Sequence, residues 1–227
     1  MTGKYSGQPI TNSAAAEFAI YAMLSSNCYH HDDREVFKVE KLGWFLQKKE
    51  KHIGGLAYDI YRHADSGKVI WAFRGTDSKL DYLTANLAFL PFSPFNQYKK
   101  ANKVFSRYVE SNGIEKLSVC GHSLGGGLAL SMSVRHGVPA FTFDSSPRIF
   151  DGLGDDHKEA QRVIVYEDGE ILQKIRAFYP KVKEVVPESS IYKCSFNFSN
   201  SQHRGDKLAR GLLEIGSKEN LELVPLV

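Results

Sequence analysis

The five residues GHSLG at positions 121–125 constrain this chain more than any other feature of its sequence. They lie between a short apolar run that ends at Cys120 and a segment, residues 125–136, with the composition of a helix. A G-x-S-x-G sequence in this context is typical of a sharp turn from strand to helix, in which the serine hydroxyl projects from the carboxyl end of a sheet. The motif therefore predicts that Ser123 is a nucleophile.

A serine nucleophile needs a general base, and three histidines follow Ser123 in the chain: His136, His157 and His203. His136 belongs to the same predicted helix as the motif and would lie about 20 Å away, which is too far. His203 lies in a polar loop (SNSQHR) before the last predicted helix, from which it can fold back over the edge of the sheet. We choose His203 as the base, and we keep His157, in the acidic loop GDDHKE, as the alternative.

The acid that orients the histidine should follow a strand that comes after the nucleophile. Residues 162–168 (RVIVYED) have the composition of such a strand, and a turn is expected at Gly169. Asp168 is therefore the predicted acid, since Glu167 should point to the other side of the extended chain. Asp144, at the end of the preceding predicted strand, is the alternative.

Two backbone N–H groups are candidates for stabilising an oxyanion. Leu124 stands at the start of a predicted helix, where free N–H groups and the helix dipole favour negative charge. The second donor should come from the loop after the predicted strand 68–73 (KVIWAF), and Thr76 is the best source there. Arg74, in the same loop, is expected to be structural and to pair with a carboxylate beneath the site.

The distribution of apolar residues predicts an alternation of strands and helices. Helices are expected at residues 13–24, 97–110, 125–136 and 207–215, and strands at 54–62, 68–73, 116–120, 140–144 and 162–166. The first helix should have Asn12 or Ser13 as its cap. Its apolar face should contain Ala16, Ile20, Met23 and Leu24. The first two strands should form a hairpin through residues 65–67 (DSG). This order predicts an α/β fold with a mainly parallel central sheet and helices on both faces. Without an internal repeat or linker, residues 1–227 are expected to form a single domain.

The composition is that of a globular protein and excludes a disordered chain, because 42% of the 227 residues are hydrophobic and 24% are charged. A net charge of +3, with dispersed basic residues, does not predict nucleic acid as a partner. The densest basic run, residues 48–51 (KKEK), is expected to be a solvated face or a turn. The three cysteines are odd in number and lack CxxC spacing, which predicts neither a zinc site nor a disulfide framework.

The sequence also leads to expectations about location and cofactors. It begins without the apolar region of a signal peptide and contains no apolar stretch long enough for a transmembrane helix. We expect a cytoplasmic protein, or one exported without a cleavable signal peptide. No glycine pattern for a phosphate or a dinucleotide has the required context, so no cofactor is expected. No metal is expected either, because acyl transfer through a serine needs none.

Four segments together resemble the class 3 lipase family, the fungal lipase-like α/β-hydrolases. Residues 72–76 (AFRGT) with 81–87 (DYLTANL) look like the oxyanion segment and the helix after it, and residues 121–126 (GHSLGG) look like the nucleophile turn. Residues 141–148 (FTFDSSPR) are similar to the strand after that turn, and 162–168 match the acid strand. The acid segment departs from the family in reading EDGE at 167–170, where Asn-Asp and a proline are frequent. The resemblance runs in order through residues 13–213.

The resemblance implies an α/β-hydrolase fold with Ser123, Asp168 and His203 as the catalytic triad and with Thr76 and Leu124 at the oxyanion hole. It implies a serine carboxylic ester hydrolase, a lipase or phospholipase that cleaves fatty-acyl esters through an acyl-enzyme. The expected partner is a lipid or ester substrate at a membrane surface. The alternatives are a soluble short-chain esterase and a non-catalytic relative that uses the fold for binding. Residues 82–98, rich in Leu, Phe and Pro, are either a lid or acyl groove or an ordinary packed connection.

Overall fold

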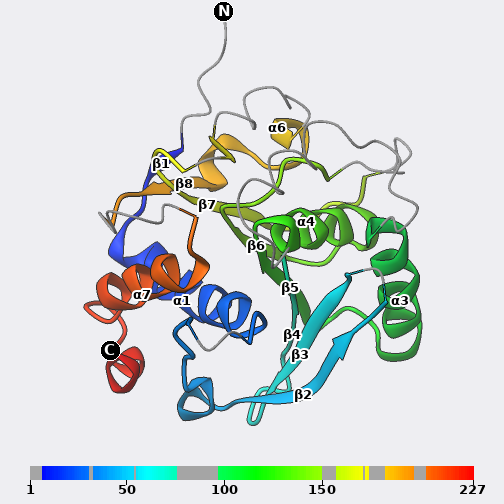
Figure 1. Ribbon diagram of the computed structural model, residues 1–227, viewed down its shortest axis with the longest axis horizontal. Coiled ribbons are helices and arrows are strands. Elements are labelled where there is room, and N and C mark those ends of the chain that lie inside the picture. Colours follow the sequence, from blue (N-terminus) through cyan, green and yellow to red (C-terminus); the bar gives the residue numbers. More distant parts are fainter. Residues whose placement is uncertain are drawn as a thin grey trace, which may run out of the picture.

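The computed structural model describes residues 7–30, 33–53, 55–75, 97–149, 157–170, 172–173, 182–196 and 203–227. Its centre is an eight-stranded sheet with the order β1-β8-β7-β6-β5-β4-β3-β2 (Figure 1). The strands are β1 (Gln8–Pro9), β2 (Trp44–Lys51), β3 (Ala57–His63), β4 (Val69–Phe73), β5 (Leu117–His122), β6 (Ala140–Phe143), β7 (Arg162–Glu167) and β8 (Ile191–Cys194).

The sheet is mainly parallel, as the alternation of strands and helices predicts. All pairs from β4 through β8 to β1 are parallel, whereas β3 pairs antiparallel with both β2 and β4. The strands β1, β2 and β8 are not among the predicted elements. In β2 the cause is its composition: the sequence WFLQKKEK is largely exposed and lacks the alternation of a half-buried strand.

Helices cover both faces of the sheet (Figure 1). On one face α1 (Asn12–Asn27) packs against α7 (Gly205–Gly216), and on the other α3 (Gln97–Asn112) packs against α4 (Leu124–His136). The other short elements among the described residues are α6 (Val182–Val185) and the 3-10 turns η1 (Val39–Leu42), η2 (Glu188–Ser190) and η3 (Leu221–Leu226). The four long helices are those that the sequence predicts, each extended by one to four residues.

Strand β4 shows how both faces of the sheet are filled. Trp71 and Phe73 belong to the core under α3 and α4, whereas Ile70 and Ala72, between them in sequence, belong to the core under α1 and α7. This alternation follows from the period of two residues along a strand. Because both sets are fully buried, the strand reads as a continuous apolar run, which is typical of a central parallel strand.

Helix α1 differs from its prediction in two details. Its cap is Thr11, whose hydroxyl accepts a hydrogen bond from the Ala14 N–H at 3.2 Å, and not Asn12 or Ser13. Ala16 and Ile20, expected on the apolar face, are only half-buried. Met23 and Leu24 are buried as expected, and the rest of the buried face is formed by Ala15, Phe18, Ala19 and Ala22.

The lowered pKa of His136, at the end of α4, leads us to expect a loss of stability in acid. Burial, together with the charges of Lys158 and Arg135, lowers the pKa of His136 to about 4, and its Nε2 lies 2.8 Å from Asn102 Oδ1. The unfolded chain takes up this proton near pH 6.5, before the folded chain does, so the free energy of unfolding should fall as the pH drops from about 6.5 towards about 4. Urea unfolding at neutral pH and at about pH 5 should show a smaller fall in His136→Gln than in the wild type. An equal fall in both proteins would contradict this assignment.

Candidate active site

Ser123 alone forms the turn between a strand and a helix, since β5 ends at His122 and α4 begins at Leu124. Its backbone angles, φ 60° and ψ −127°, are unusual for a residue with a side chain and cost on the order of 1–3 kcal/mol. Two hydrogen bonds hold this conformation: the Ser123 N–H donates to Phe143 O at 3.0 Å, and the Ser123 carbonyl accepts from the Ser146 N–H at 2.9 Å. The predicted strand-to-helix turn is therefore present.

The two glycines of the motif allow this turn to pack. A Cβ on Gly121 would lie 2.3 Å from the carbonyl of Gly125, and a Cβ on Gly125 would lie 2.1 Å from Phe73 O. Both distances are far below van der Waals contact, and both obstacles are backbone atoms. Only glycine fits at either position.

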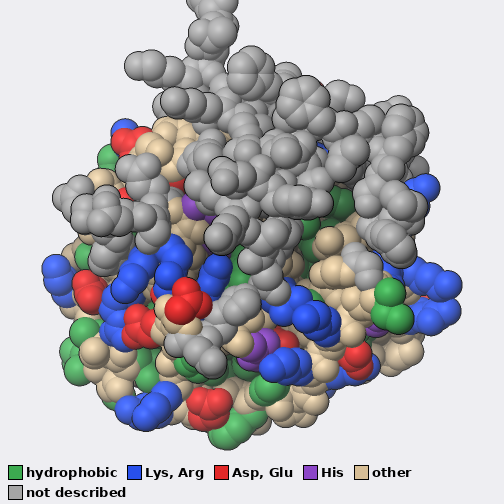
Figure 2. Space-filling model, viewed as in Figure 1, with side chains coloured by type: hydrophobic (Ala, Val, Ile, Leu, Met, Phe, Trp, Pro, Cys, Tyr) green, Lys and Arg blue, Asp and Glu red, His purple; other side chains and the backbone are tan. Residues whose placement is uncertain are grey.

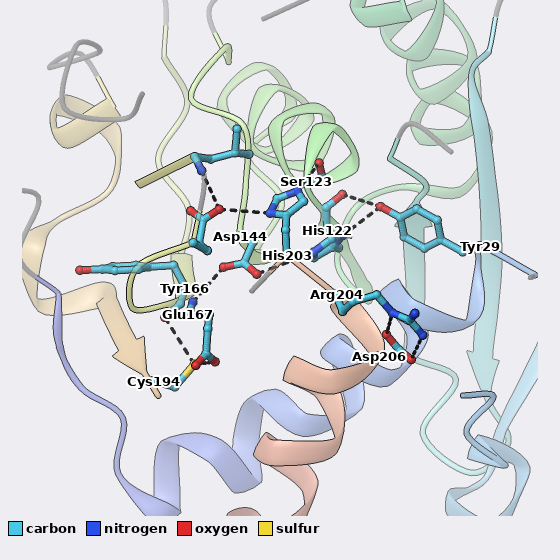
Figure 3. Close-up of polar contacts among 12 residues, drawn as sticks. Tyr29, His122, Ser123, Asp144, Tyr166, Glu167, Cys194, His203, Arg204 and Asp206 are labelled. Atoms are coloured by element: carbon cyan, nitrogen blue, oxygen red, sulfur yellow. Dashed lines mark hydrogen bonds and ion pairs between the residues drawn. The ribbon is translucent and has the colours of Figure 1, made fainter. Parts of the chain in front are cut away.

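The structure brings His203 to Ser123, although 80 residues separate them in sequence (Figure 3). His203 Nε2 lies 2.9 Å from Ser123 Oγ. The histidine lies two residues before α7, and the residue between them, Arg204, is anchored by hydrogen bonds to the buried carboxylate of Asp206 and to the backbone oxygen of Asp33. The start of α7 therefore holds the imidazole over the carboxyl end of β5.

The alternative base, His157, lies elsewhere. The neighbouring Lys158 N–H donates to Val134 O at 2.9 Å, in the last turns of α4. Ser123 precedes the first residue of that helix, so the length of α4 separates the two sites.

The carboxylate beside His203 belongs to Glu170. Its Oε2 lies 3.1 Å from His203 Nδ1 and also accepts a hydrogen bond from the Leu172 N–H at 2.7 Å. Glu170 is 1% exposed. Because a carboxylate can only accept a hydrogen bond, this contact favours the imidazole tautomer with its proton on Nδ1, in which Nε2 is an acceptor for the Ser123 hydroxyl.

The expectation that Asp168 orients His203 is thereby corrected to Glu170. The chain turns immediately after β7, where Gly169 has φ 84° and the Glu170 N–H donates to Glu167 O at 3.1 Å. Asp168 is left exposed in this turn and accepts a hydrogen bond from the side chain of Gln173 at 3.0 Å. The reversal carries the first carboxylate beyond the turn back towards His203. In the sequence, Gly169 indicates the turn but not which carboxylate points to His203.

The other two carboxylates considered from the sequence support the strands. Glu167 points towards β8, where it accepts the Phe196 N–H at 2.8 Å, and burial raises its pKa. Asp144 is 1% exposed and accepts the Glu167 N–H at 2.8 Å, so that it ties β7 to the end of β6. Neither makes the contact with His203 Nδ1 that Glu170 makes.

His122, the second residue of the motif, supports His203 from below (Figure 3). The two imidazole rings lie 4.8 Å apart, and a Cβ on Gly205 would lie 2.9 Å from His122 Cγ. Tyr29 Oη lies 3.0 Å from His122 Nδ1 and 3.2 Å from His122 O. The sequence analysis missed this support, because Tyr29 is 93 residues away from His122 in the chain.

His122, Asp144 and His203 also form a group whose potential ligand atoms lie within 4.8 Å of one another in the described part of the chain. Both ring nitrogens of His203 already contact Ser123 and Glu170. A metal ion bound to His203 would have to break one of these two contacts. We therefore assign these residues to the hydrogen-bonded site and not to a metal site.

Of the two predicted oxyanion donors, Leu124 is among the described residues and Thr76 is not. Leu124 is the first residue of α4, so its N–H is one of those that a helix leaves without an internal partner. Thr76 lies outside the described residues, as do residues 82–96 of the segment discussed as a lid. The residue before Thr76 is placed: a Cβ on Gly75 would lie 3.2 Å from Ser123 Cβ and 2.3 Å from Tyr29 Oη. The loop after β4 therefore passes directly beside the nucleophile.

Comparison with known proteins shows the family and the fold of this chain. A family described as phospholipase-like, the Tle-like phospholipase domain, matches residues 21–192. The native Rhizomucor miehei lipase propeptide complex has a TM-score of 0.50 at 18% identity, and the match covers 77% of this chain and 66% of the lipase chain. A deletion mutant of the same complex has a TM-score of 0.50 at 16% identity, and the match covers 89% of this chain and 77% of the lipase chain. The Lip2 lipase of Yarrowia lipolytica has a TM-score of 0.48 at 16% identity, with 77% of each chain covered.

A search of curated proteins finds no match. In the parts that the structure describes, no helix has both the length and the apolar character needed to cross a membrane. The structural neighbours show the fold, and the family match covers well over half of the sequence. This chain therefore has the α/β-hydrolase fold of the lipases and belongs to the phospholipase-like family defined by the Tle-like phospholipase domain.

Proposed function

We propose that this chain is a serine carboxylic ester hydrolase that cleaves fatty-acyl esters of phospholipids. The observation that carries the proposal is the continuous contact from Ser123 Oγ to His203 and from His203 to the buried carboxylate of Glu170. Ordinary packing does not require a serine with a strained backbone to meet an imidazole and a carboxylate in this order. The family match supports phospholipid as the substrate class.

The first half of the proposed reaction forms an acyl-enzyme. His203 Nε2 removes the proton from Ser123 Oγ while that oxygen attacks the ester carbonyl. Glu170 stabilises the imidazolium ion, and the Leu124 N–H, together with a donor from the loop at Thr76, stabilises the oxyanion. The intermediate collapses when His203 returns the proton to the departing alcohol oxygen, so that the acyl group stays on Ser123.

The second half releases the fatty acid by the same groups. Water attacks the acyl carbon while His203 Nε2 removes one of its protons, and a second oxyanion forms in the same place. His203 then protonates Ser123 Oγ as the carbon–oxygen bond to the serine breaks. The products are a lysophospholipid and a fatty acid, and the enzyme regains its starting protonation state.

The test compares substrate classes with purified protein and Ser123→Ala as the control. The wild type should release fatty acid from phospholipid vesicles and should be labelled by a fluorophosphonate, whereas Ser123→Ala should do neither. Higher activity on nitrophenyl acetate or butyrate than on long-chain esters, without a gain on vesicles, would support the short-chain esterase instead. A folded wild-type protein that no fluorophosphonate labels would support a binding role without catalysis.

A further inference from the structure

The turn between β2 and β3 presents one unusually exposed apolar side chain. Ile53 is 89% exposed, the highest value among the large hydrophobic residues that the structure describes. Two backbone hydrogen bonds flank Ile53: the His52 N–H donates to Leu56 O at 2.8 Å, and the Gly55 N–H donates to His52 O at 3.2 Å. The exposed apolar surface of Ile53 is available for burial against a partner, and such burial is favourable.

This turn lies at the same edge of the sheet as Ser123. Lys51, the last residue of β2, pairs with Ala57, and the Ala57 carbonyl accepts the Arg74 N–H at 3.0 Å just beyond the end of β4. On the other side of β4, Phe73 pairs with Gly121, two residues before Ser123. Because β4 lies between β3 and β5, these two strands are two strand spacings apart, which is about 10 Å. Ile53 and the nucleophile therefore face the same side of the molecule.

The surroundings of Ile53 are strongly basic. Lys100 Nζ donates to the Ile53 carbonyl, which joins the first turn of α3 to the β2–β3 turn. Strand β2 and the first two turns of α3 together carry six lysines and one glutamate; the lysines are Lys48, Lys49, Lys51, Lys99, Lys100 and Lys103. Figure 2 shows a hydrophobic side chain bordered by Lys and Arg side chains at the right of the molecule, over this turn and α3.

We propose that this region, Ile53 with Lys51 and Lys100, is a docking site for the surface of an anionic phospholipid bilayer. An apolar side chain that enters the boundary between headgroups and acyl chains, with lysines around it that meet lipid phosphates, is the arrangement that binds such surfaces. Docking there turns the carboxyl edge of the sheet, with Ser123, towards the lipid. The inference rests on the proposed function only in that the bilayer also supplies the substrate.

Binding is measured with the Ser123→Ala protein, so that the vesicles are not consumed. Vesicles of phosphatidylcholine, with and without phosphatidylglycerol, are floated with each variant. The protein should bind the anionic vesicles and lose them at high salt. Ile53→Ser should weaken binding about tenfold, and Lys51→Glu, which reverses one charge, about 20- to 30-fold.

Leu221→Ser and Lys218→Glu are matched controls. Leu221 is 79% exposed, and Lys218 is also exposed, but both follow the end of α7 that lies farthest from His203. These variants should bind the vesicles as the parent does. In proteins that retain Ser123, Ile53→Ser and Lys51→Glu should hydrolyse a soluble nitrophenyl ester at the parent rate and lose activity only on vesicles. Lys49→Glu is the replacement should Lys51→Glu fail to fold.

Two results would overturn the docking site. One is equal vesicle binding by Ile53→Ser, Lys51→Glu and the controls, and the other is equal binding to vesicles with and without phosphatidylglycerol. Failure of the proposed function would give a different result. The wild type would hydrolyse no ester, but the Ser123→Ala protein would still bind vesicles through Ile53 and Lys51. That result would leave the docking site supported.

Discussion

Replacing His203 with alanine is expected to lower kcat for ester hydrolysis by about 10⁶-fold, the size of loss seen when the base of a serine triad is removed. The reason is the 2.9 Å contact between His203 Nε2 and Ser123 Oγ, which is the path for the proton in both halves of the reaction that we propose. His157→Ala is the matched control, because its neighbour Lys158 bonds to the far end of α4. The kcat of this control should stay within about twofold of the wild type.

The measurement is steady-state hydrolysis of a soluble ester by folded protein, with the fold checked by circular dichroism. Labelling by a fluorophosphonate should also disappear in His203→Ala, because the serine then lacks its base. Loss of activity in His157→Ala, with activity retained in His203→Ala, would reverse the assignment.

Replacing Glu170 with glutamine is expected to lower kcat by about 10³- to 10⁴-fold. Glutamine keeps the size of the side chain but removes the negative charge that stabilises the imidazolium ion. Its amide can also donate to His203 Nδ1, which favours the tautomer with the proton on Nε2, where it blocks the transfer from Ser123. Asp168→Asn should keep its kcat within about twofold of the wild type, because this carboxylate is exposed and bonds to Gln173.

Comparing Glu170→Gln with Asp168→Asn distinguishes the acid that contacts His203 in the structure from the acid that the sequence predicts. Both substitutions remove one carboxylate from the same turn, two residues apart, so a general effect of charge would appear in both. A large loss in Asp168→Asn with little change in Glu170→Gln would restore the acid that the sequence alone favours. Large losses in both variants would point to disruption of the turn at Gly169.

The strand-to-helix turn could be predicted because its requirements are local. Positions 121 and 125 must be glycine because a Cβ there would collide with atoms that lie within a few residues or in the adjacent strand. The apolar run before the motif and the helix after it are also visible in the sequence. The central strands could be predicted for a similar reason, since β4 is apolar throughout and β7 is apolar between its charged end residues, Arg162 and Glu167. Strand β2 could not, because an exposed edge strand has no buried face to impose a pattern.

The choice of acid was a different kind of problem, because it depends on where a short turn directs a side chain. Asp168 and Glu170 have the same chemistry and nearly the same place in the sequence. They differ in that the turn at Gly169 leaves one in water and buries the other at 1% exposure against His203. A local pattern holds no information about that direction, since the position of His203 is set by the start of α7, more than 30 residues further along the chain.

The sequence by itself determined the class of fold, the position of Ser123 and the candidate base, because a tight turn and a buried strand restrict the residues that form them. Only the tertiary structure decided that Glu170 is the carboxylate in contact, that Tyr29 and His122 support the imidazole, and that Ile53 stands on the same side as Ser123. Each of these depends on where distant segments meet, and that is settled by the packing of the two helical layers on the sheet and by the register of its strands.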